Sequence, residues 1–98
     1  MSDLLQILDP DGKKVGTIPR VKQDILLDMY RAMVRTRAFD DRCMKLQRTG
    51  KVGFSVPNQG IEAVSVGAAA ALDISRDWVA PHYRDFGIMF YHGVSPED

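Results

Sequence analysis

The 98-residue sequence has no excess charge of either sign, since 13 acidic residues balance 13 basic ones. Nucleic-acid-binding domains usually show a clear basic excess, and solvating arms an acidic one. No apolar run approaches the roughly 20 residues that are needed to cross a bilayer. The composition therefore argues against a nucleic-acid or membrane partner, while a hydrophobic content of 45% is ordinary for a globular protein.

Cysteine and histidine are scarce as well. Cys43 is the one cysteine, so no disulfide can form within the chain, and a reducing compartment such as the cytoplasm is the simplest expectation. One cysteine and two histidines do not make a convincing zinc site, and the sequence has neither a Walker loop nor a Gly-x-Gly-x-x-Gly loop. We therefore predict no metal site in this chain. Residues 1–13 also lack the charged and then apolar layout of a signal peptide.

Glycine and proline are absent from residue 22 to residue 49. Within this stretch Ile25, Met29 and Met33 recur every four residues, which is the apolar stripe of a helix. Gly50 is the residue type that most often follows the end of a helix. We expect one long helix here, with its methionines in a core.

Residues 4–8 and 13–18 are typical of the two strands of a hairpin. The intervening Asp9-Pro10-Asp11-Gly12 favours a tight turn, because proline presets φ and glycine accepts a positive φ. An isolated two-stranded hairpin is marginal in water, so we expect it to pack on another body, such as a second subunit.

The second half of the chain predicts two shorter helices and a strand. Residues 61–72 form a helical pattern in which the run Gly67-Ala68-Ala69-Ala70-Ala71 indicates tight burial. Residues 78–81 predict a short buried strand, and residues 83–92 predict a third helix.

A Tyr-Arg pair, Tyr83 and Arg84, follows this strand. A planar guanidinium can hold two oxygens of an anion, a phenol can donate to another, and free N–H groups at a helix start strengthen the attraction. The pattern is typical of a phosphate site, although an arginine after a short strand is more often a surface or ion-pair residue. The residues alone leave both interpretations open.

Other charged residues have structural interpretations. Arg37 and Asp41 are spaced as an i, i+4 helix pair, whereas the adjacent carboxylates of Asp40 and Asp41 point in different directions. Glu62 opens the second helix, where a negative charge is favourable. His92 lies near a helix end, where it can cap carbonyl groups.

Four motifs occur in a fixed order, and together they carry a family resemblance. They are Met29-Tyr30-Arg31-Ala32-Met33 with Arg37-Ala38-Phe39-Asp40, Leu46-Gln47-Arg48-Thr49-Gly50-Lys51, Gly60-x-Glu62-Ala63 with Gly67, and Tyr83-Arg84-Asp85 with Gly87. In this order and spacing the sequence resembles the alpha subunit of the decarboxylating (dehydrogenase) component of 2-oxo acid dehydrogenase complexes.

The resemblance implies an α/β fold that binds thiamine diphosphate. Residues 1–98 would be a single N-terminal portion of that domain, with a hairpin arm at 1–19 and a helical and αβ part at 20–98. Family members are several times longer, and Ser95-Pro96-Glu97 is typical of the start of a further helix. We therefore expect the chain to be truncated at its C-terminal end.

The resemblance also assigns site residues. Tyr83 and Arg84 would bind the diphosphate of the cofactor, His82 would border the same site, and Phe54 and Tyr83 would shape the pocket for the 2-oxo acid. Val56 stands where some pyruvate-type members have a histidine, which argues against that subgroup. The Gly-Asp-Gly motif that holds Mg²⁺ in the family is absent from these residues, so we expect the Mg²⁺ ligands, and any catalytic residue, outside this fragment.

By resemblance, the activity would be the oxidative decarboxylation of a 2-oxo acid, with acyl transfer to lipoyl groups of an acyltransferase component. The first-choice substrate is a branched-chain acid of the 2-oxoisovalerate type; a pyruvate or acetoin dehydrogenase alpha subunit is the alternative. The partner would be a beta subunit in an α2β2 assembly, and the 98-residue chain would be inactive alone. A hypothesis from another class is a non-catalytic helical fragment that self-associates through Met29, Met33 and the run at residues 67–71.

Overall fold

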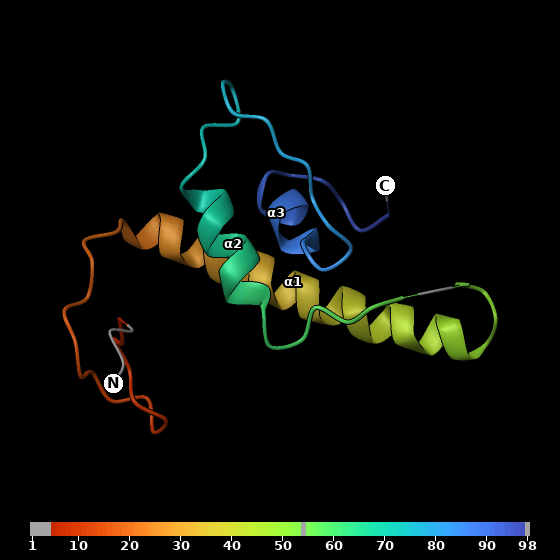
Figure 1. Cartoon of the computed structure of the whole chain (residues 1–98), viewed down its shortest axis with the longest axis horizontal. Helices are drawn as coiled ribbons and strands as arrows, with labels where there is room; N and C mark the ends of the chain where they lie inside the picture. Colours follow the sequence, from red (N-terminus) through yellow and green to blue (C-terminus); the bar gives the residue numbers. More distant parts are fainter. Residues whose placement is uncertain (1–4, 54, 98) are drawn as a thin grey trace.

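The computed structural model describes residues 5–53 and 55–97 of the chain. These residues contain three α-helices, α1 (Gln23–Arg48), α2 (Glu62–Ala70) and α3 (Phe86–Tyr91). None of the three has both the length and the apolar content of a membrane-spanning segment. Figure 1 shows α1 as a long rod with α2 and α3 packed against its central part. Each helix contacts both of the others, so the packed part of the chain is a small three-helix unit.

Helix α1 confirms the long helix expected over residues 22–49. Its end is a Schellman motif, in which Gly50 donates its N–H to the carbonyl of Gln47 at 3.0 Å and Lys51 donates to that of Leu46 at 3.0 Å. Gly50 has a φ of 79°, which glycine adopts without the strain that a Cβ would cause. The motif turns the chain back along α1.

The two shorter helices lie where the sequence predicts them, but each is shorter than expected. Helix α3 begins only at Phe86, because residues 82–85 form a turn in which the N–H of Asp85 donates to the carbonyl of His82 at 3.0 Å. Tyr83 and Arg84 therefore lie in the turn before the helix and do not open it.

The three helices meet at Gly87 of α3, which is buried. A Cβ added there would lie 3.0 Å from Cγ2 of Val66, 3.3 Å from Cβ of Ser65 and 3.3 Å from Oγ1 of Thr36. Helix α3 can approach α1 and α2 this closely because glycine has no side chain. The buried apolar residues around this junction are Ala32, Val66, Ala69 and Phe90.

The small-residue run of α2 is only partly buried. Ala69 is fully buried, whereas Gly67, Ala68 and Ala71 are exposed. The expectation of tight burial for the whole run is wrong, because one face of α2 meets the other two helices and no described residue covers the opposite face.

The buried face of α1 differs from the one that the sequence pattern predicts. Its buried positions are Ala32, Thr36 and Asp40, spaced four residues apart, and the Thr36 hydroxyl donates to the carbonyl of Ala32 at 2.7 Å. The predicted stripe is only half-buried, and larger apolar side chains are exposed at Leu26, Leu27, Tyr30 and Val34.

The strand expected at residues 78–81 is not present in the described part of the chain. Trp78 is 98% exposed, and the described residues form no strand. A strand must exchange backbone hydrogen bonds with a neighbour, and the described residues contain no second strand to supply them.

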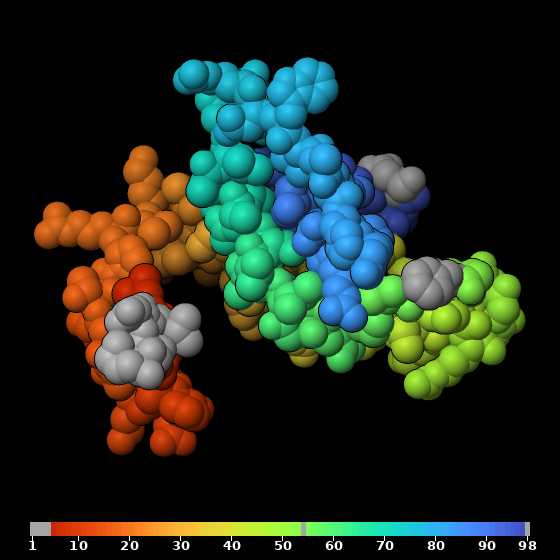
Figure 2. Space-filling view, in the orientation of Figure 1, coloured from red at the N-terminus to blue at the C-terminus, as the bar shows by residue number. Residues whose placement is uncertain are grey.

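Residues 5–22 form an arm that extends from the start of α1, away from the packed helices (Figure 1, Figure 2). Of the expected hairpin, residues 5–18 show a turn with an antiparallel bridge between Leu8 and Lys14, and Val15 donates its N–H to the carbonyl of Ile7 at 2.7 Å. The carbonyl of Asp9 accepts the N–H of Gly12 at 2.9 Å, and Gly12 has a φ of 82°, as the turn sequence predicts. The arm exposes the apolar side chains of Leu5, Leu8, Val15 and Ile18.

Candidate functional site

The turn before α3 contains three of the predicted site residues. The Asp85 carboxylate accepts the backbone N–H of His82 at 2.9 Å and the hydroxyl of Ser65 at 3.4 Å. The same hydroxyl lies 3.5 Å from the carbonyl oxygen of Arg84, so α2 holds the turn from one side. The rings of His82 and Tyr83 lie next to each other, with their centroids 3.6 Å apart and their planes tilted by 37°. The structure therefore brings His82, Tyr83 and Arg84 together at one exposed turn.

The two anion-binding side chains of this turn are available for a ligand. Tyr83 is 54% exposed, Arg84 is exposed, and within residues 5–53 and 55–97 Arg84 forms no ion pair. A free guanidinium beside a free phenol suits a diphosphate. The helix start expected to assist them is displaced, since Asp85 is the N-cap of α3 and places a carboxylate there.

An apolar groove begins at Tyr83, and we call it the Tyr83 groove. It has a volume of about 420 Å³. The ring of Phe39 at its α1 side stands edge-on to Phe86, with centroids 5.4 Å apart. Phe54 lies outside the described residues, but neighbouring residues on both sides of it line the groove. The lining residues are Phe39, Cys43, Leu46, Val52, Ser55, Val56, Tyr83 and Phe86.

The groove is uncharged at neutral pH. Burial raises the pKa of the Cys43 thiol, and the negative charge of Asp40 raises it further, so the thiol stays protonated. Besides this thiol, the polar side-chain groups of the lining residues are the Tyr83 phenol and the Ser55 hydroxyl. The arrangement can accommodate a small aliphatic group next to an anion-binding turn.

Sequence analysis missed a buried carboxylate beside this groove. Asp40 is 1% exposed, and its two oxygens accept the backbone N–H of Asn58 at 2.5 Å and the side-chain amide of Asn58 at 2.8 Å. The adjacent Asp41 is exposed and accepts the amide of Gln59 at 2.9 Å, so the two carboxylates do point in different directions. One signal could have located Asp40, since it lies four residues after Thr36 on the face that also contains Ala32 and Phe39.

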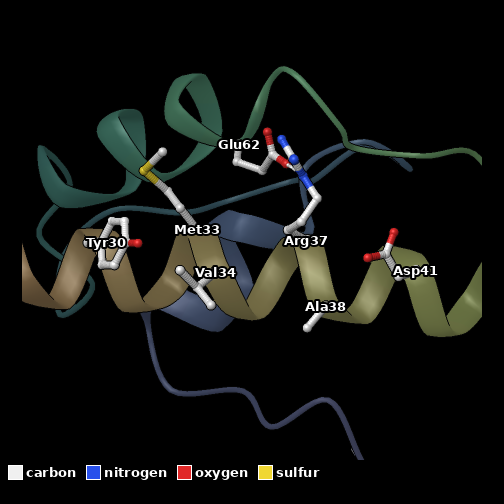
Figure 3. A pocket seen from close by; sticks show the side chains of 7 residues that line it. All are labelled: Tyr30, Met33, Val34, Arg37, Ala38, Asp41 and Glu62. Carbon is white, nitrogen blue, oxygen red and sulfur yellow. Dashed lines mark hydrogen bonds and ion pairs between the residues drawn. The ribbon is translucent and has the colours of Figure 1, made fainter. Parts of the chain in front are cut away.

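The ion pair expected between Arg37 and Asp41 is wrong. Figure 3 shows Arg37 reaching from α1 to Glu62 at the start of α2, and its Nε donates to the Glu62 carboxylate at 2.5 Å. The other Glu62 oxygen accepts the N–H of Gly60 at 2.8 Å. The Arg37 hydrogen bond lowers the pKa of Glu62 against the effect of burial, so Glu62 is ionised and serves a structural contact.

This pair borders a second groove, on the outer side of α1 (Figure 3). It is lined by Tyr30, Met33, Val34, Arg37, Ala38, Asp41 and Glu62, and none of the predicted site residues lies in it.

His92 does not join the Tyr83 turn. It is the C-cap of α3, its ring faces Tyr91 with centroids 5.3 Å apart, and its Nε2 is buried without a hydrogen-bond partner. The expected side-chain capping of a carbonyl by this nitrogen is therefore not observed. Among residues 5–53 and 55–97, no group of three or more His, Cys, Asp or Glu side chains is placed to hold a metal ion.

Comparison with known proteins identifies relatives of this chain. Residues 30–98 match the family described as the dehydrogenase E1 component. The 2-oxoisovalerate dehydrogenase subunit alpha of Bacillus subtilis is 46% identical over 72 residues, which is 74% of this chain and 22% of the relative. The pyruvate dehydrogenase E1 component subunit alpha of Staphylococcus epidermidis is 36% identical over 98 residues, covering 98% of this chain and 26% of the relative.

A further relative is the pyruvate dehydrogenase E1 component subunit alpha of Bacillus cereus, which is 36% identical over 94 residues. No solved structure matches the chain. The chain spans about a quarter of the length of the curated relatives it matches. Because the family match covers more than half of the sequence, this chain belongs to the dehydrogenase E1 component family.

Proposed function

We propose that this chain is part of the alpha subunit of a thiamine diphosphate-dependent 2-oxo acid dehydrogenase and contributes its Tyr-Arg turn to the diphosphate site. The observation that carries the proposal is the exposed Tyr83-Arg84 pair beside an apolar groove, in a chain whose residues 30–98 match the E1 family. When bound, thiamine diphosphate supplies the electron sink that decarboxylation of a 2-oxo acid requires.

The residues of this turn have distinct roles in the proposal. The Arg84 guanidinium would hold the diphosphate, the Tyr83 hydroxyl would donate a hydrogen bond to it, and His82, whose ring lies next to that of Tyr83, would border the site. Asp85 is already hydrogen-bonded to the N–H of His82, and this bond keeps its carboxylate within the turn. The Mg²⁺ ligands and the catalytic residues belong to parts of the enzyme outside these 98 residues.

The substrate in this proposal is a branched-chain 2-oxo acid of the 2-oxoisovalerate type. The apolar lining of the Tyr83 groove, which includes Tyr83, suits an aliphatic side chain, and by the family resemblance Phe54 would face the same substrate group. The relative that acts on 2-oxoisovalerate is 46% identical, against 36% for the two pyruvate dehydrogenase relatives. The alternative is a pyruvate or acetoin dehydrogenase alpha subunit. The ratio of the kcat/KM values for 2-oxoisovalerate and pyruvate tests which of the two substrates the enzyme prefers.

The partners in the proposal are a beta subunit, in an α2β2 assembly, and a lipoyl-bearing acyltransferase component, in the cytoplasm. The described residues leave apolar side chains uncovered on the arm and at Leu26, Tyr30 and Val34 of α1. Such a surface supports the proposal that a partner subunit covers it. We further propose that residues 78–81 complete a parallel sheet of an α/β fold in the complete subunit, and that the 98 residues alone are inactive.

The experiment that tests the function is Arg84→Lys in the complete subunit assembled with its beta partner. Lysine supplies a point charge in place of the guanidinium fork, so thiamine diphosphate binding should weaken by about 1–3 kcal/mol, measured by isothermal titration. Arg76→Lys is the matched control, since Arg76 is exposed in the same connection and outside the turn. Equal affinities of the Arg84 variant and the wild type would remove Arg84 from the cofactor site.

A further inference from the structure

The connection between α1 and α2, residues 49–61, is attached to the helices mainly at its two ends. At the first end, Lys51 and Val52 donate their N–H groups to the carbonyl of Leu46. In the part of the chain that the structure describes, residues 55–57 take part in no hydrogen bond. The position of the middle of this connection is therefore set by what holds Asn58, where its second end begins.

Asp40 of α1 holds that second end. Asn58 is as buried as Asp40, at 1% exposure each, and it donates both its backbone N–H and its side-chain amide to the two oxygens of this carboxylate. The side-chain carbonyl of Asn58 is buried and has no hydrogen-bond partner, so Asp40 alone orients this amide by hydrogen bonding. A buried carboxylate that accepts two hydrogen bonds is a strong and geometrically specific anchor.

Two further contacts flank this anchor but are more exposed. Gln59 donates to the exposed carboxylate of Asp41 at 2.9 Å, and Gly60 donates to Glu62 at 2.8 Å. The Gln59–Asp41 hydrogen bond is exposed, so it exchanges readily with water and contributes little to position, whereas the Gly60–Glu62 bond is part-buried. Among the described contacts that residues 58–60 make to α1 and α2, the Asp40–Asn58 contact is the one that is fully buried.

The anchored segment forms one wall of the Tyr83 groove. Val52, Ser55 and Val56 line that wall, while Phe39, the residue before Asp40, lines the opposite α1 side. Because Asp40 and Phe39 are adjacent on α1, the Asp40–Asn58 contact fixes the distance between the two walls of the groove.

We propose that Asp40 is a positioning residue that sets the width of the groove in which the 2-oxo acid side chain lies; this inference rests on the proposed function. Asp40 touches neither substrate nor cofactor and acts through Asn58. Its carboxylate accepts in two directions, as the two N–H donors of Asn58 require. Asparagine at position 40 would present one acceptor and one NH₂ group, and the NH₂ group would face a second donor.

The test compares Asp40→Asn with Asp41→Asn in the complete subunit assembled with its beta partner. In the first variant, the ratio of kcat/KM for 2-oxoisovalerate to that for pyruvate should change about tenfold, because one wall of the groove moves. The Kd of thiamine diphosphate should stay within about twofold of the wild-type value, since the Tyr83 turn does not depend on Asp40. The matched Asp41→Asn variant, with the same chemical change one residue away, should leave the ratio unchanged.

An exchange of the two side chains separates positioning from a loss of folding. In the double variant Asp40→Asn with Asn58→Asp, residue 40 can still accept the N–H of residue 58 and donate to its carboxylate, so the substrate ratio should return towards the wild-type value. Asn58→Ala is a milder variant that keeps the backbone N–H donor, and it should change the ratio in the same direction as Asp40→Asn. A substrate ratio that stays constant in Asp40→Asn and Asn58→Ala would overturn the proposal.

Hydrogen exchange of the peptide that covers residues 52–58 gives a readout that is independent of the reaction. Asp40→Asn should speed exchange of the Asn58 amide in this peptide, which is the amide bonded to Asp40, by about tenfold or more and leave the peptide that covers residues 82–85 unchanged. Unchanged exchange at residues 52–58 would overturn the anchoring role of Asp40. A wild-type enzyme with no activity on any 2-oxo acid would contradict the proposed function, and the anchoring role would then be decided by this exchange experiment.

Discussion

The two connections between the helices of this chain are held in different ways. The first, residues 49–61, is attached to α1 by the buried Asp40 carboxylate through hydrogen bonds that span 18 residues of sequence. The second, residues 71–85, is held mostly by its own short-range bonds, such as those of Asp73 with the N–H of Ser75 and with Asp77. Figure 2 shows this second connection lying on the surface of the molecule.

The two halves of the proposed site, the groove wall and the Tyr83-Arg84 turn, are therefore held to the helices in different ways. The wall of the groove that contains Val56 is tied to the helix core, so its position depends on the folding of α1. The turn that contains Tyr83 and Arg84 meets the helices chiefly through the hydroxyl of Ser65, at 3.4 Å from Asp85 and 3.5 Å from the Arg84 carbonyl. Those are long contacts, so we infer that the substrate wall is rigid and that the cofactor turn can adjust to its ligand.

The largest expected change in the free energy of unfolding comes from a comparison of Asp40 and Asp85, the carboxylates that hold the two connections. Asp40→Ala leaves two buried donors of Asn58 without an acceptor, so the free energy of unfolding of the chain should fall by about 2–3 kcal/mol. Asp85→Ala removes the acceptor of an exposed N–H, which water can satisfy, and of the Ser65 hydroxyl, which still lies 3.5 Å from the Arg84 carbonyl, so it should cost only about 1 kcal/mol. Urea unfolding followed by circular dichroism measures both values. Equal costs for the two variants would mean that the two connections are held equally.

Acid should loosen the second end of the first connection, where Gly60 is bound by Glu62. The Arg37 hydrogen bond holds the pKa of Glu62 below its ordinary value of 4.5, and Glu62 in turn accepts the N–H of Gly60. Because the folded-state pKa is lowered, this stabilisation is fully present above pH 4.5 and is lost as the pH falls through the folded-state value. The Glu62 contacts raise the pKa of Arg37, so the guanidinium stays charged throughout.

The corresponding measurement is the free energy of unfolding of Glu62→Gln at a series of pH values. At pH 7 the variant should be about 1 kcal/mol less stable than the wild type, because half of the pair is solvent-exposed. The gap should close below pH 4.5, where the wild-type Glu62 becomes protonated and resembles glutamine. Asp41→Asn is the control and should show a gap of less than about 0.5 kcal/mol at every pH. A gap for Glu62→Gln that persists at low pH would show that its charge is not the source of stability.

Local sequence patterns predicted the ends of elements better than the contacts between them. The Schellman end of α1 and the turn at Asp9 follow from glycine at the positions with positive φ, which is a local property. The Arg37 contact was predicted within the helix because the i, i+4 rule considers one element at a time. The structure instead pairs Arg37 with Glu62 of another helix, which only the crossing of α1 and α2 determines.

The buried polar contact and the missing strand have related causes. A stripe of large apolar residues is the usual sign of a buried helix face, but the three-helix junction is narrow and accommodates Ala32, Thr36 and Asp40 instead. Residues 78–81 have the composition of a strand, yet a strand forms only beside a partner strand. The positions of Tyr83 and Arg84 in one exposed turn follow from their adjacency in sequence, whereas their distance to the groove depends on how α3 packs.

A smaller change in stability is expected for a substitution at Gly87 in α3, the helix that follows the second connection. Gly87→Ala places a Cβ 3.0 Å from Cγ2 of Val66 at the helix junction, so the neighbouring side chains must move by a few tenths of an ångström, and the chain should lose about 1 kcal/mol of stability. Gly67→Ala is the matched control in α2, where a Cβ meets nothing within 4 Å. Alanine is the better helix former, so this variant should gain about 0.5–1 kcal/mol. Thermal unfolding measures both, and the same sign for the two variants would contradict the close packing at Gly87.

The smallest effect is expected in the middle of the second connection. Trp78 is the only tryptophan of the chain and is 98% exposed, so Trp78→Ala should change the free energy of unfolding by less than about 0.5 kcal/mol. A tryptophan buried in a strand, as the sequence pattern predicts, would cost about 3–5 kcal/mol when truncated to alanine. The fluorescence of Trp78 in the chain should match that of free indole in water. Assembly of the complete subunit should shift the emission to shorter wavelength if residues 78–81 join a sheet there, so one probe reports on the second connection in both states.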